Sequence, residues 1–416
     1  MEIEARSRSH RGLDGVNFFI AAVQTGFGAF VTVYLVKQLW PPHAIGFALT
    51  VSTMSALFSQ IPAGAVLDSM RDKRRAVLVG IAGVGLAALL LCLTAAPVAV
   101  YLALALQGLA SSLIAPGIAA ISLALVGQAG LSERIGRNAR FASIGNGLAA
   151  GIMGIAGSHL PVVSVFIVSA VLALPAMLSL SLISGEEASW TAANPPPIDG
   201  PEQGDARITW QGVKSLLLDR RLAIFAACVV LFFTASSAMG PGVAAHVTKR
   251  WPDFATLIVA AMILVPQAIV AAISPWIGRR AETTGRRPLL LLGWGLIPVQ
   301  GLLYATLAGP FALALGNLLN AVSSAIFGVT MTVVVADLTR RTGCFNLTLG
   351  ALGVAVAAGC SLSTFFAGIS AATFGARTTV LGLALVGLCG LLLLWAGMPE
   401  TRPQRMAPDG FGPSAE

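Results

Sequence analysis

Long apolar stretches alternate with short polar ones along almost the whole chain. A helix needs about 20 predominantly apolar residues to cross the hydrocarbon core of a bilayer, and the apolar stretches are about that long or longer. The alternation therefore predicts an all-α polytopic membrane protein with twelve transmembrane helices. We expect these helices at residues 13–36, 44–67, 76–96, 98–126, 141–159, 161–183, 221–245, 254–277, 288–308, 310–336, 346–370 and 376–397.

The longest polar interruption, residues 184–220, divides the twelve segments into six and six. It is rich in Pro, Gly and acidic residues, a composition typical of a flexible linker. The predicted organisation is two pseudo-symmetric six-helix bundles joined by this linker. The expected regions are a cytoplasmic N-terminal tail at 1–12, an N-terminal bundle at 13–183, a cytoplasmic linker at 184–220, a C-terminal bundle at 221–398 and a cytoplasmic C-terminal tail at 399–416.

The composition excludes a water-soluble protein. Charged residues make up 11% of the 416 residues and hydrophobic residues 56%, with a mean hydropathy of +0.83, whereas soluble domains carry about 25% charged residues. The first apolar run is too long for the apolar region of a signal peptide, which is about 7–15 residues, so we expect it to stay as the first helix. The five cysteines lack the spacing of metal ligands, and we expect no metal and no cofactor.

The basic residues are distributed unevenly between the two predicted sides. If the N-terminus is cytoplasmic, 22 of the 26 Lys and Arg residues fall in cytoplasmic segments, and the four outside are Lys37, Lys249, Arg250 and Arg377. Cytoplasmic loops are enriched in Lys and Arg, and one missed helix would reverse every later loop. The pattern predicts a multi-pass protein of the cell (inner or plasma) membrane with both termini cytoplasmic. It also argues against a nucleic acid as partner.

Two basic loops occupy matching places, one after the second predicted helix and one after the eighth. In each, a Gly precedes an acidic residue by four positions and a basic cluster follows. The two Gly residues lie 214 positions apart, about half the chain, and a duplication of six helices explains this spacing. The first loop contains Gly64, Asp68, Arg71, Lys73 and Arg74, and the second contains Gly278, Glu282, Gly285 and Arg286.

These loops, with the six-plus-six spacing and the charge asymmetry, resemble the major facilitator superfamily over residues 13–400. The signature of that family is a Gly, three residues, an Asp, a basic residue, any residue, a Gly and then basic pairs. The first loop departs from it at Ser69 and Arg71, and the second at Glu282 and Thr283. The resemblance implies a secondary transporter that works by alternating access and is not an enzyme.

The acidic residues of these loops are candidates for a gate at the cytoplasmic side. An acid at a helix end can pair with an Arg of the neighbouring bundle, and near the polar–apolar boundary such a pair is screened less than in water. By resemblance, Asp68 with its basic cluster and Glu282 with Arg286 would hold the cytoplasmic side closed in an outward-open state. The alternative is that the basic residues only enforce topology. Asp337, after the tenth helix, can pair with Arg340 or Arg341 or reach across, and it is a second gating cluster or plain boundary charge.

The resemblance places the first, fourth, seventh and tenth helices around a central cavity. Polar residues in lipid usually face a cavity or another helix, so substrate contact and structural hydrogen bonding both stay open for them. No Asp, Glu, Lys or Arg falls in the middle of a predicted span, and desolvating an ion without a partner is prohibitive. We therefore expect a small, neutral or amphipathic organic substrate. The candidate cavity residues are Asn17, Gln24, Gln107, Ser111, Ser237, Asn317 and Asn320.

Proton coupling requires a group whose pKa can be moved by burial and by its neighbours. Asp14, near the cytoplasmic end of the first helix, is the first candidate, and its alternative role is to complement the helix dipole. His246, near the outer end of the seventh helix, is the second candidate. Coupling through Asp68 or Asp337, or no coupling at all, are the remaining alternatives.

We favour proton-linked efflux by a monomer, with uptake or uniport of a neutral metabolite as the alternative. The glycines of the fifth helix, Gly145, Gly147 and Gly151, are similar to a pattern of drug-exporting relatives but lack its Pro. A non-transporting sensor or scaffold is a hypothesis of another class. An intramembrane enzyme is disfavoured because no mid-membrane catalytic cluster occurs, and an ATP-driven pump because the Gly-x4-Gly-Lys-Ser/Thr sequence is absent.

Overall fold

The computed structural model describes residues 2–27, 29–184, 219–240, 255–307, 309–340 and 342–401. Within these ranges the chain is almost entirely helical and contains no strand. The helices of the first half are α1 (Glu2–Thr25), α2 (Ala29–Lys37), α3 (Pro42–Ser69), α4 (Lys73–Leu93), α5 (Pro97–His159) and α6 (Val163–Ser181). Those of the second half are α9 (Arg220–Ser236), α11 (Ala255–Thr284), α12 (Arg286–Thr306), α13 (Pro310–Leu338), α14 (Phe345–Phe374) and α15 (Ala376–Gly397).

Each of the twelve predicted spans corresponds to a described helix or to part of one. The first span consists of α1 and α2, and the fourth and fifth are the two halves of α5, which bends at Gly127. Gly127 has a φ of 66°, a backbone conformation that favours glycine. Nine helices of the described residues are long and apolar enough to cross a membrane, and the one at Pro97–Ala156 has 60 residues, enough for two crossings. The predicted all-α fold of two six-helix bundles is confirmed.

Two segments that we expected to be a tail and a loop are helical instead. α1 already begins at Glu2, within the predicted tail 1–12, and residues 128–140 belong to the second half of α5. Leu131 and Ile135 in that predicted loop are buried against the second half of the molecule. The helix therefore continues beyond the predicted span because its side chains pack against the other half. The apolar pattern of a single span does not show such packing. The predicted linker, apart from its ends, and the tail after Thr401 lie outside the described residues.

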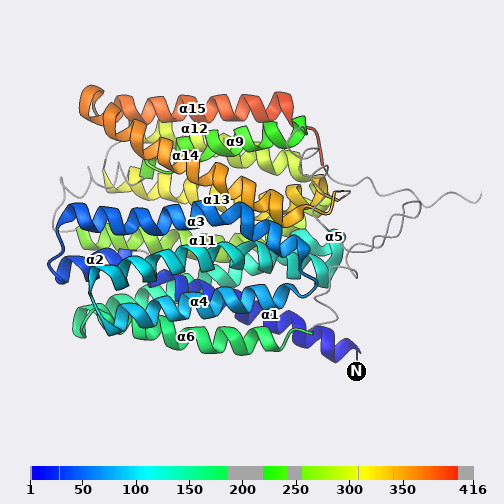
Figure 1. The fold of residues 1–416 in the computed structure, drawn as a ribbon. Coiled ribbons are helices and arrows are strands. Elements are labelled where there is room, and N and C mark those ends of the chain that lie inside the picture. Colours follow the sequence, from blue (N-terminus) through cyan, green and yellow to red (C-terminus); the bar gives the residue numbers. More distant parts are fainter. Residues whose placement is uncertain are drawn as a thin grey trace, which may run out of the picture.

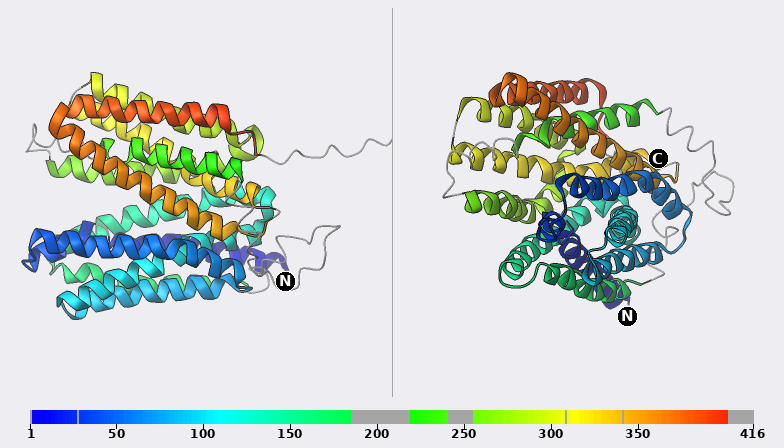
Figure 2. Two further views of the ribbon diagram at one scale, coloured as in Figure 1. Left: turned by 45° about the horizontal axis from the view of Figure 1, so that its top comes forward. Right: turned by 60° about the vertical axis from the view of Figure 1, so that its left-hand side comes forward.

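The two halves form two layers, as Figure 2 shows. The start of α1, the bend of α5 and the end of α15 lie at one end of the molecule, on the right in Figure 1. We call this end the basic end, because the described residues there include Arg71, Lys73, Arg137, Arg287 and Arg340. The other end is called the opposite end.

Each half has its own apolar core, and the two cores are joined toward the basic end. The first core contains residues such as Leu13, Val77 and Phe166. The second contains Phe225 and Trp294 together with Ala119, Ala120, Leu123, Leu131 and Ile135 from α5 of the first half. Because these α5 residues lie on both sides of the Gly127 bend, the first half contributes to the second core at the basic end.

Candidate functional site

The signature acid of the first half binds the start of a helix of the second half. Asp68, at the end of α3, accepts hydrogen bonds from the backbone N–H of Asn346 (3.0 Å) and of Leu347 (2.8 Å) and from Nδ2 of Asn346 (2.7 Å). Asn346 and Leu347 are the second and third residues of α14, whose first backbone N–H groups have no partner within the helix. The carboxylate thus satisfies these groups and faces the positive end of the helix dipole.

The second signature acid makes a related contact. The backbone N–H of Glu133, in α5, donates to the carboxylate of Glu282, at the end of α11, over 3.3 Å. Glu282 lies 214 positions after Asp68, and Leu347 lies 214 positions after Glu133, so the two contacts follow one internal repeat. The contact of Glu282 is longer and more exposed than those of Asp68, and we expect it to be the weaker of the two.

Both predictions about these acids therefore need a correction. We expected Asp68 to pair with its basic cluster and Glu282 to pair with Arg286. The hydrogen-bond donors to the two carboxylates are instead mainly backbone groups of the other half, whereas Lys73 acts on Asp68, and Arg286 on Glu282, through its charge. A helix terminus offers several converging N–H donors at fixed positions, whereas a long Arg side chain must be ordered to make one pair. Arg71 is exposed, and Arg74 donates its backbone N–H to Asp72 of its own half (3.1 Å).

Glycines permit the close approach of backbones beside these acids. A Cβ atom on Gly64 would collide with the carbonyl oxygen of Asn346, and one on Gly278 with that of Ser132. The reciprocal contacts repeat the pattern at the same spacing, because Gly350 meets the carbonyl of Gln60 and Gly136 that of Ser274. Small residues at helix crossings let backbones pack closely in a membrane, so α3 packs on α14 and α5 on α11.

The contact between the halves weakens toward the opposite end. Along the second half of α5, Gly136 is in tight contact with α11, a Cβ on Gly147 would lie 3.7 Å from Gln267, and Gly151 and Gly154 have nothing within 4 Å. The α14 helix shows the same trend, from Gly350 near the basic end to Gly368, which has open space. The two halves are therefore closed against each other at the basic end and separate toward the opposite end.

Two buried cations donate hydrogen bonds to the helix ends at which the signature loops begin. Lys73, the first residue of α4, donates to the carbonyls of Leu67 and Met70 at the end of α3. Arg286, the first residue of α12, donates to the carbonyl of Ala281 near the end of α11 (2.8 Å). Both side chains are almost completely buried. Each cation satisfies carbonyl groups at a helix C-terminus, where positive charge is favourable.

Asp337 pairs with Arg286 and not with Arg340, one of its two expected Arg partners; the other, Arg341, lies outside the described residues. The Nε–Oδ2 distance is 3.1 Å, and both side chains are almost inaccessible to solvent, whereas Arg340 is exposed. Glu400, which sequence reasoning missed, joins this cluster by accepting the backbone N–H groups of Arg286 (2.9 Å) and Arg287 (3.0 Å). No motif marks Glu400, because its role depends only on where the chain runs after α15.

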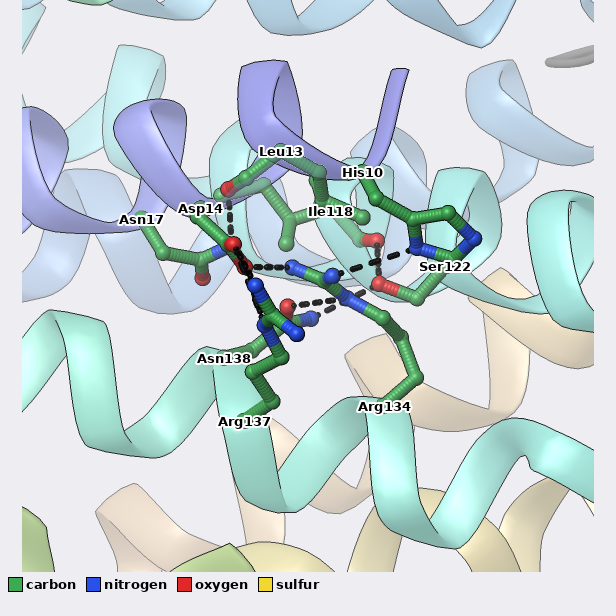
Figure 3. Close-up of polar contacts among 9 residues, drawn as sticks. All are labelled: His10, Leu13, Asp14, Asn17, Ile118, Ser122, Arg134, Arg137 and Asn138. Atoms are coloured by element: carbon green, nitrogen blue, oxygen red, sulfur yellow. Dashed lines mark hydrogen bonds and ion pairs between the residues drawn. The ribbon is translucent and has the colours of Figure 1, made fainter. Parts of the chain in front are cut away.

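Asp14 lies in a second buried cluster, which Figure 3 shows. Its carboxylate pairs with Arg134 Nη2 (2.6 Å) and Arg137 Nη2 (2.5 Å), both from α5. Arg134 also donates to Asn138 (2.8 Å), which in turn donates to Ser122 (2.7 Å). The role of Asp14 in the structure is thus to hold α1 against α5 within the first half. The Arg residues are 120 and more positions away, so the sequence did not identify them as partners.

Several predicted cavity residues are engaged within their own half. Gln107 accepts from Ser52 (2.8 Å) and donates to Ser111 (3.1 Å), which ties α3 to α5. Ser237 contacts Cys360 (3.2 Å), and Asn17 donates to the carbonyl of Leu13 (2.7 Å). Asn317 is buried, Gln24 and Asn320 are partly exposed, and His246 lies outside the described residues. Substrate contact by these residues stays a prediction.

The comparisons with known proteins agree with the predicted resemblance. The family model of the Major Facilitator Superfamily matches residues 13–344. An MFS-type transporter of Mycobacterium tuberculosis strain CDC 1551 is 33% identical over 397 residues, which is 95% of this chain and 94% of the relative. The chain belongs to the major facilitator superfamily.

Solved structures of major facilitator proteins share the fold. The crystal structure of the human organic anion transporter MFSD10 (TETRAN) has a TM-score of 0.71 at 16% identity and covers 94% of this chain and 99% of its own. That of the Escherichia coli fucose:proton symporter FucP has a TM-score of 0.65 at 14% identity, with 94% and 98% covered. As a member of the major facilitator superfamily, the protein is a multi-pass membrane transporter that moves small molecules by alternating access, and such proteins are generally not enzymes.

Proposed function

We propose that this transporter exports a small, neutral or amphipathic organic molecule across the cell membrane by exchange with protons. In this proposal the basic end faces the cytoplasm, both termini are cytoplasmic and the protein works as a monomer. The structure then corresponds to an outward-facing state, closed by Asp68 and Glu282. Uptake or uniport of a neutral metabolite is the alternative, and the name of the fucose:proton symporter is compatible with it.

The observation that carries the substrate class is the absence of charged residues from the middle of the predicted spans. The stretches 15–36, 76–132, 141–184, 288–336 and 342–376 contain no Asp, Glu, Lys or Arg. Because an ion without a partner pays a large desolvation penalty in a low-dielectric site, a substrate with a fixed charge is disfavoured. The name of the organic anion transporter MFSD10 would suggest an anion, but these stretches offer no cation to bind one.

The proton-coupling part of the proposal rests on Asp14. Protonation of its carboxylate would leave Arg134 buried without a counter-ion, which is strongly unfavourable. A proton on Asp14 would therefore favour a rearrangement of α1 against α5, and α1 belongs to the span that the family resemblance places at the cavity. This links protonation to the shape of the transport pathway. His246 remains the second candidate.

Growth measurements test the function as a whole. A strain that lacks the gene is compared with its complemented parent on a panel of toxic compounds and of sole nutrients. We expect hypersensitivity that the intact gene rescues and that Asp14→Asn does not, whereas Asp72→Asn, an acid at the same end that caps α4, rescues normally. Failure to grow on one nutrient would establish uptake and overturn the export proposal. Rescue by Asp14→Asn would remove Asp14 from coupling.

A further inference from the structure

The cluster around Asp14 contains more positive than negative charge. Two guanidinium groups share the single carboxylate of Asp14, that of Arg134, whose side chain is 2% exposed, and that of Arg137, whose side chain is 51% exposed. Arg137 donates to Asp14 through Nε and Nη2 (Figure 3), and its Nη1 has no hydrogen-bond partner among the described residues. Asp14 therefore holds the half-exposed guanidinium group in place but does not fully compensate its charge.

Arg140 adds a second exposed charge to the same face of α5. Residues three and four positions apart share a helical face, so Glu133, Arg137 and Arg140 lie in one row. All three are exposed, and the side chain of Arg140 has no ion pair or hydrogen bond with any described residue. Neither arginine forms an ion pair with Glu133, the acid of this row, in the described structure. The row therefore presents two guanidinium groups that can accept an anion.

This face of α5 changes from basic to apolar within a few turns. After Arg140 it continues with Leu148, which is 53% exposed, and Ile152, which is 58% exposed. Exposed apolar residues of a membrane helix face the acyl chains, whereas Arg side chains near the end of a helix extend to the level of the lipid headgroups. The Arg137 guanidinium also lies over the ring of Phe141, 5.8 Å from its centroid. The face thus combines cations at the headgroup level with an apolar strip beside them.

The second half has an uncharged residue at every matching position. The contacts of Glu282 and Asp68 relate α5 to α14 by 214 positions. The pairs Thr25–Asn146 and Ser237–Cys360 relate α1 to α9 by 212. By this register the counterparts of Asp14, Arg134, Arg137 and Arg140 are Ala226, Thr348, Ala351 and Val354. Since both halves begin these helices at the same end of the molecule, the general preference for basic residues on one side of a membrane does not explain a cluster in only one half.

We propose that this face of α5 binds an anionic phospholipid, with the phosphate at Arg137 and Arg140 and an acyl chain along Leu148 and Ile152. The phosphate supplies the negative charge that the cluster lacks, and guanidinium groups bind phosphate through paired hydrogen bonds. A phosphatidylcholine compensates this charge less well, because its own cation lies beside its phosphate. The inference goes beyond the proposed function, since the site is independent of substrate, transport direction and coupling.

Photolabelling of the full chain in phosphatidylcholine nanodiscs locates the lipid. The probe is phosphatidylglycerol with a diazirine in one acyl chain, and labelled peptides are mapped by mass spectrometry. We expect labelling of α5 around Leu148 and Ile152. Unlabelled phosphatidylglycerol should displace the probe, whereas glycerol phosphate, which has a phosphate but no acyl chain, should not. Displacement by glycerol phosphate would mean that the arginines bind free phosphate and would overturn the lipid site.

Charge variants test the two arginines. In Arg137→Gln or Arg140→Gln this labelling should fall roughly fivefold, equivalent to about 1 kcal/mol for one basic residue at an anionic lipid. Because the Arg140 side chain bonds to no described residue, its variants should fold normally, and Arg140→Lys should retain most of the labelling. Arg75→Gln is the matched control, because it removes an Arg at the same end of the molecule whose side chain is 80% exposed but lies on α4.

Three results would overturn the proposal. They are equal labelling of α5 by a phosphatidylcholine probe with the same diazirine chain, unchanged labelling in both Gln variants, and an equal loss in Arg75→Gln. None of these measurements involves transport, so their outcome is separate from that of the growth test for export.

Discussion

At the scale of single residues, two ion pairs of the described structure are deeply buried. Arg134 with Asp14 and Arg286 with Asp337 are ion pairs whose side chains are almost entirely removed from solvent. Removing one partner of such a pair is far more damaging than the net value of the pair, because the other charge stays buried without compensation. Arg137, in contrast, has a side chain that is 51% exposed and can be hydrated.

We expect Asp14→Asn to destabilise the protein by about 3–5 kcal/mol and Arg137→Ala by about 1 kcal/mol or less. Asp14→Asn leaves Arg134 without its carboxylate, whereas loss of Arg137 leaves Asp14 still paired. Thermal unfolding midpoints of the purified variants give the order. Equal destabilisation by the two substitutions would contradict this account of the cluster.

The contacts of Glu400 predict a sharp limit for shortening of the chain. A chain ending at Pro399 loses the carboxylate that accepts from Arg286 and Arg287, and we expect a loss of roughly 0.5–2 kcal/mol, as for other helix caps. A chain ending at Thr401 keeps Glu400 and serves as the matched control. Thermal unfolding of both is the measurement, and identical midpoints would show that Glu400 is not a cap of importance.

Asp68→Asn should weaken the closure at the basic end. The substitution removes the charge that faces α14, and a loss of about 1.4 kcal/mol would increase the open population tenfold. Cys344, which is buried beside Asp68, reports the opening through its rate of maleimide labelling in a chain whose other cysteines are replaced. Burial and then the charge of Asp68 raise the pKa of this thiol, so the variant also gains thiolate without opening.

The pH dependence separates these two effects. A rate increase caused only by the lowered thiol pKa disappears at a pH above the pKa in both proteins, because each thiol is then ionised. An increase caused by opening persists at that pH. Persistence is the expected result, and its absence would mean that Asp68 does not hold the halves together.

At the scale of elements, four glycines decide how closely the halves approach. Gly64 and Gly350 lie where α3 crosses α14, and Gly136 and Gly278 lie where α5 crosses α11. In each case the neighbouring atom is a backbone carbonyl, which cannot move aside as a flexible side chain can. The crossings therefore require residues without side chains only at the basic end.

Gly64→Leu should prevent the closure that the structure shows. Its side chain would enter the backbone of α14, so we expect at least a roughly tenfold faster labelling of Cys344, equivalent to about 1.4 kcal/mol. Gly151→Leu introduces the same side chain on a membrane helix, at a position with open space, and should leave the rate unchanged. An unchanged rate in Gly64→Leu would show that α3 and α14 do not close the molecule.

At the scale of the whole molecule, the orientation in the membrane follows from the charge asymmetry. Reporter fusions that fold only in the cytoplasm should be active when joined after Asp72, Gly285 or Thr401, and inactive after Ala95 or Gly309. These positions lie between helices or after the last one at the two ends of the molecule. Activity in the reverse pattern would place the basic end outside and would refute the proposed direction of closure.

Much of this fold was predictable because apolar length and charge asymmetry are local properties. A span of about 20 apolar residues must be a helix in lipid, since each backbone group then bonds within its own segment. The spacing of Gly64 and Gly278 likewise predicted the repeat, and Asp68 was recognised from its place in the loop. These features need no knowledge of which helices are neighbours.

The sequence alone therefore determined the helices, the two halves, the charge asymmetry and the acids at the basic end. Only the tertiary structure decided their partners: α14 for Asp68, Arg134 for Asp14, and Arg286 for Asp337 and Glu400. The physical reason is that helix formation in a membrane depends on neighbouring residues. Hydrogen bonds and ion pairs form between groups from 51 to 279 positions apart, and helix packing alone brings those groups together.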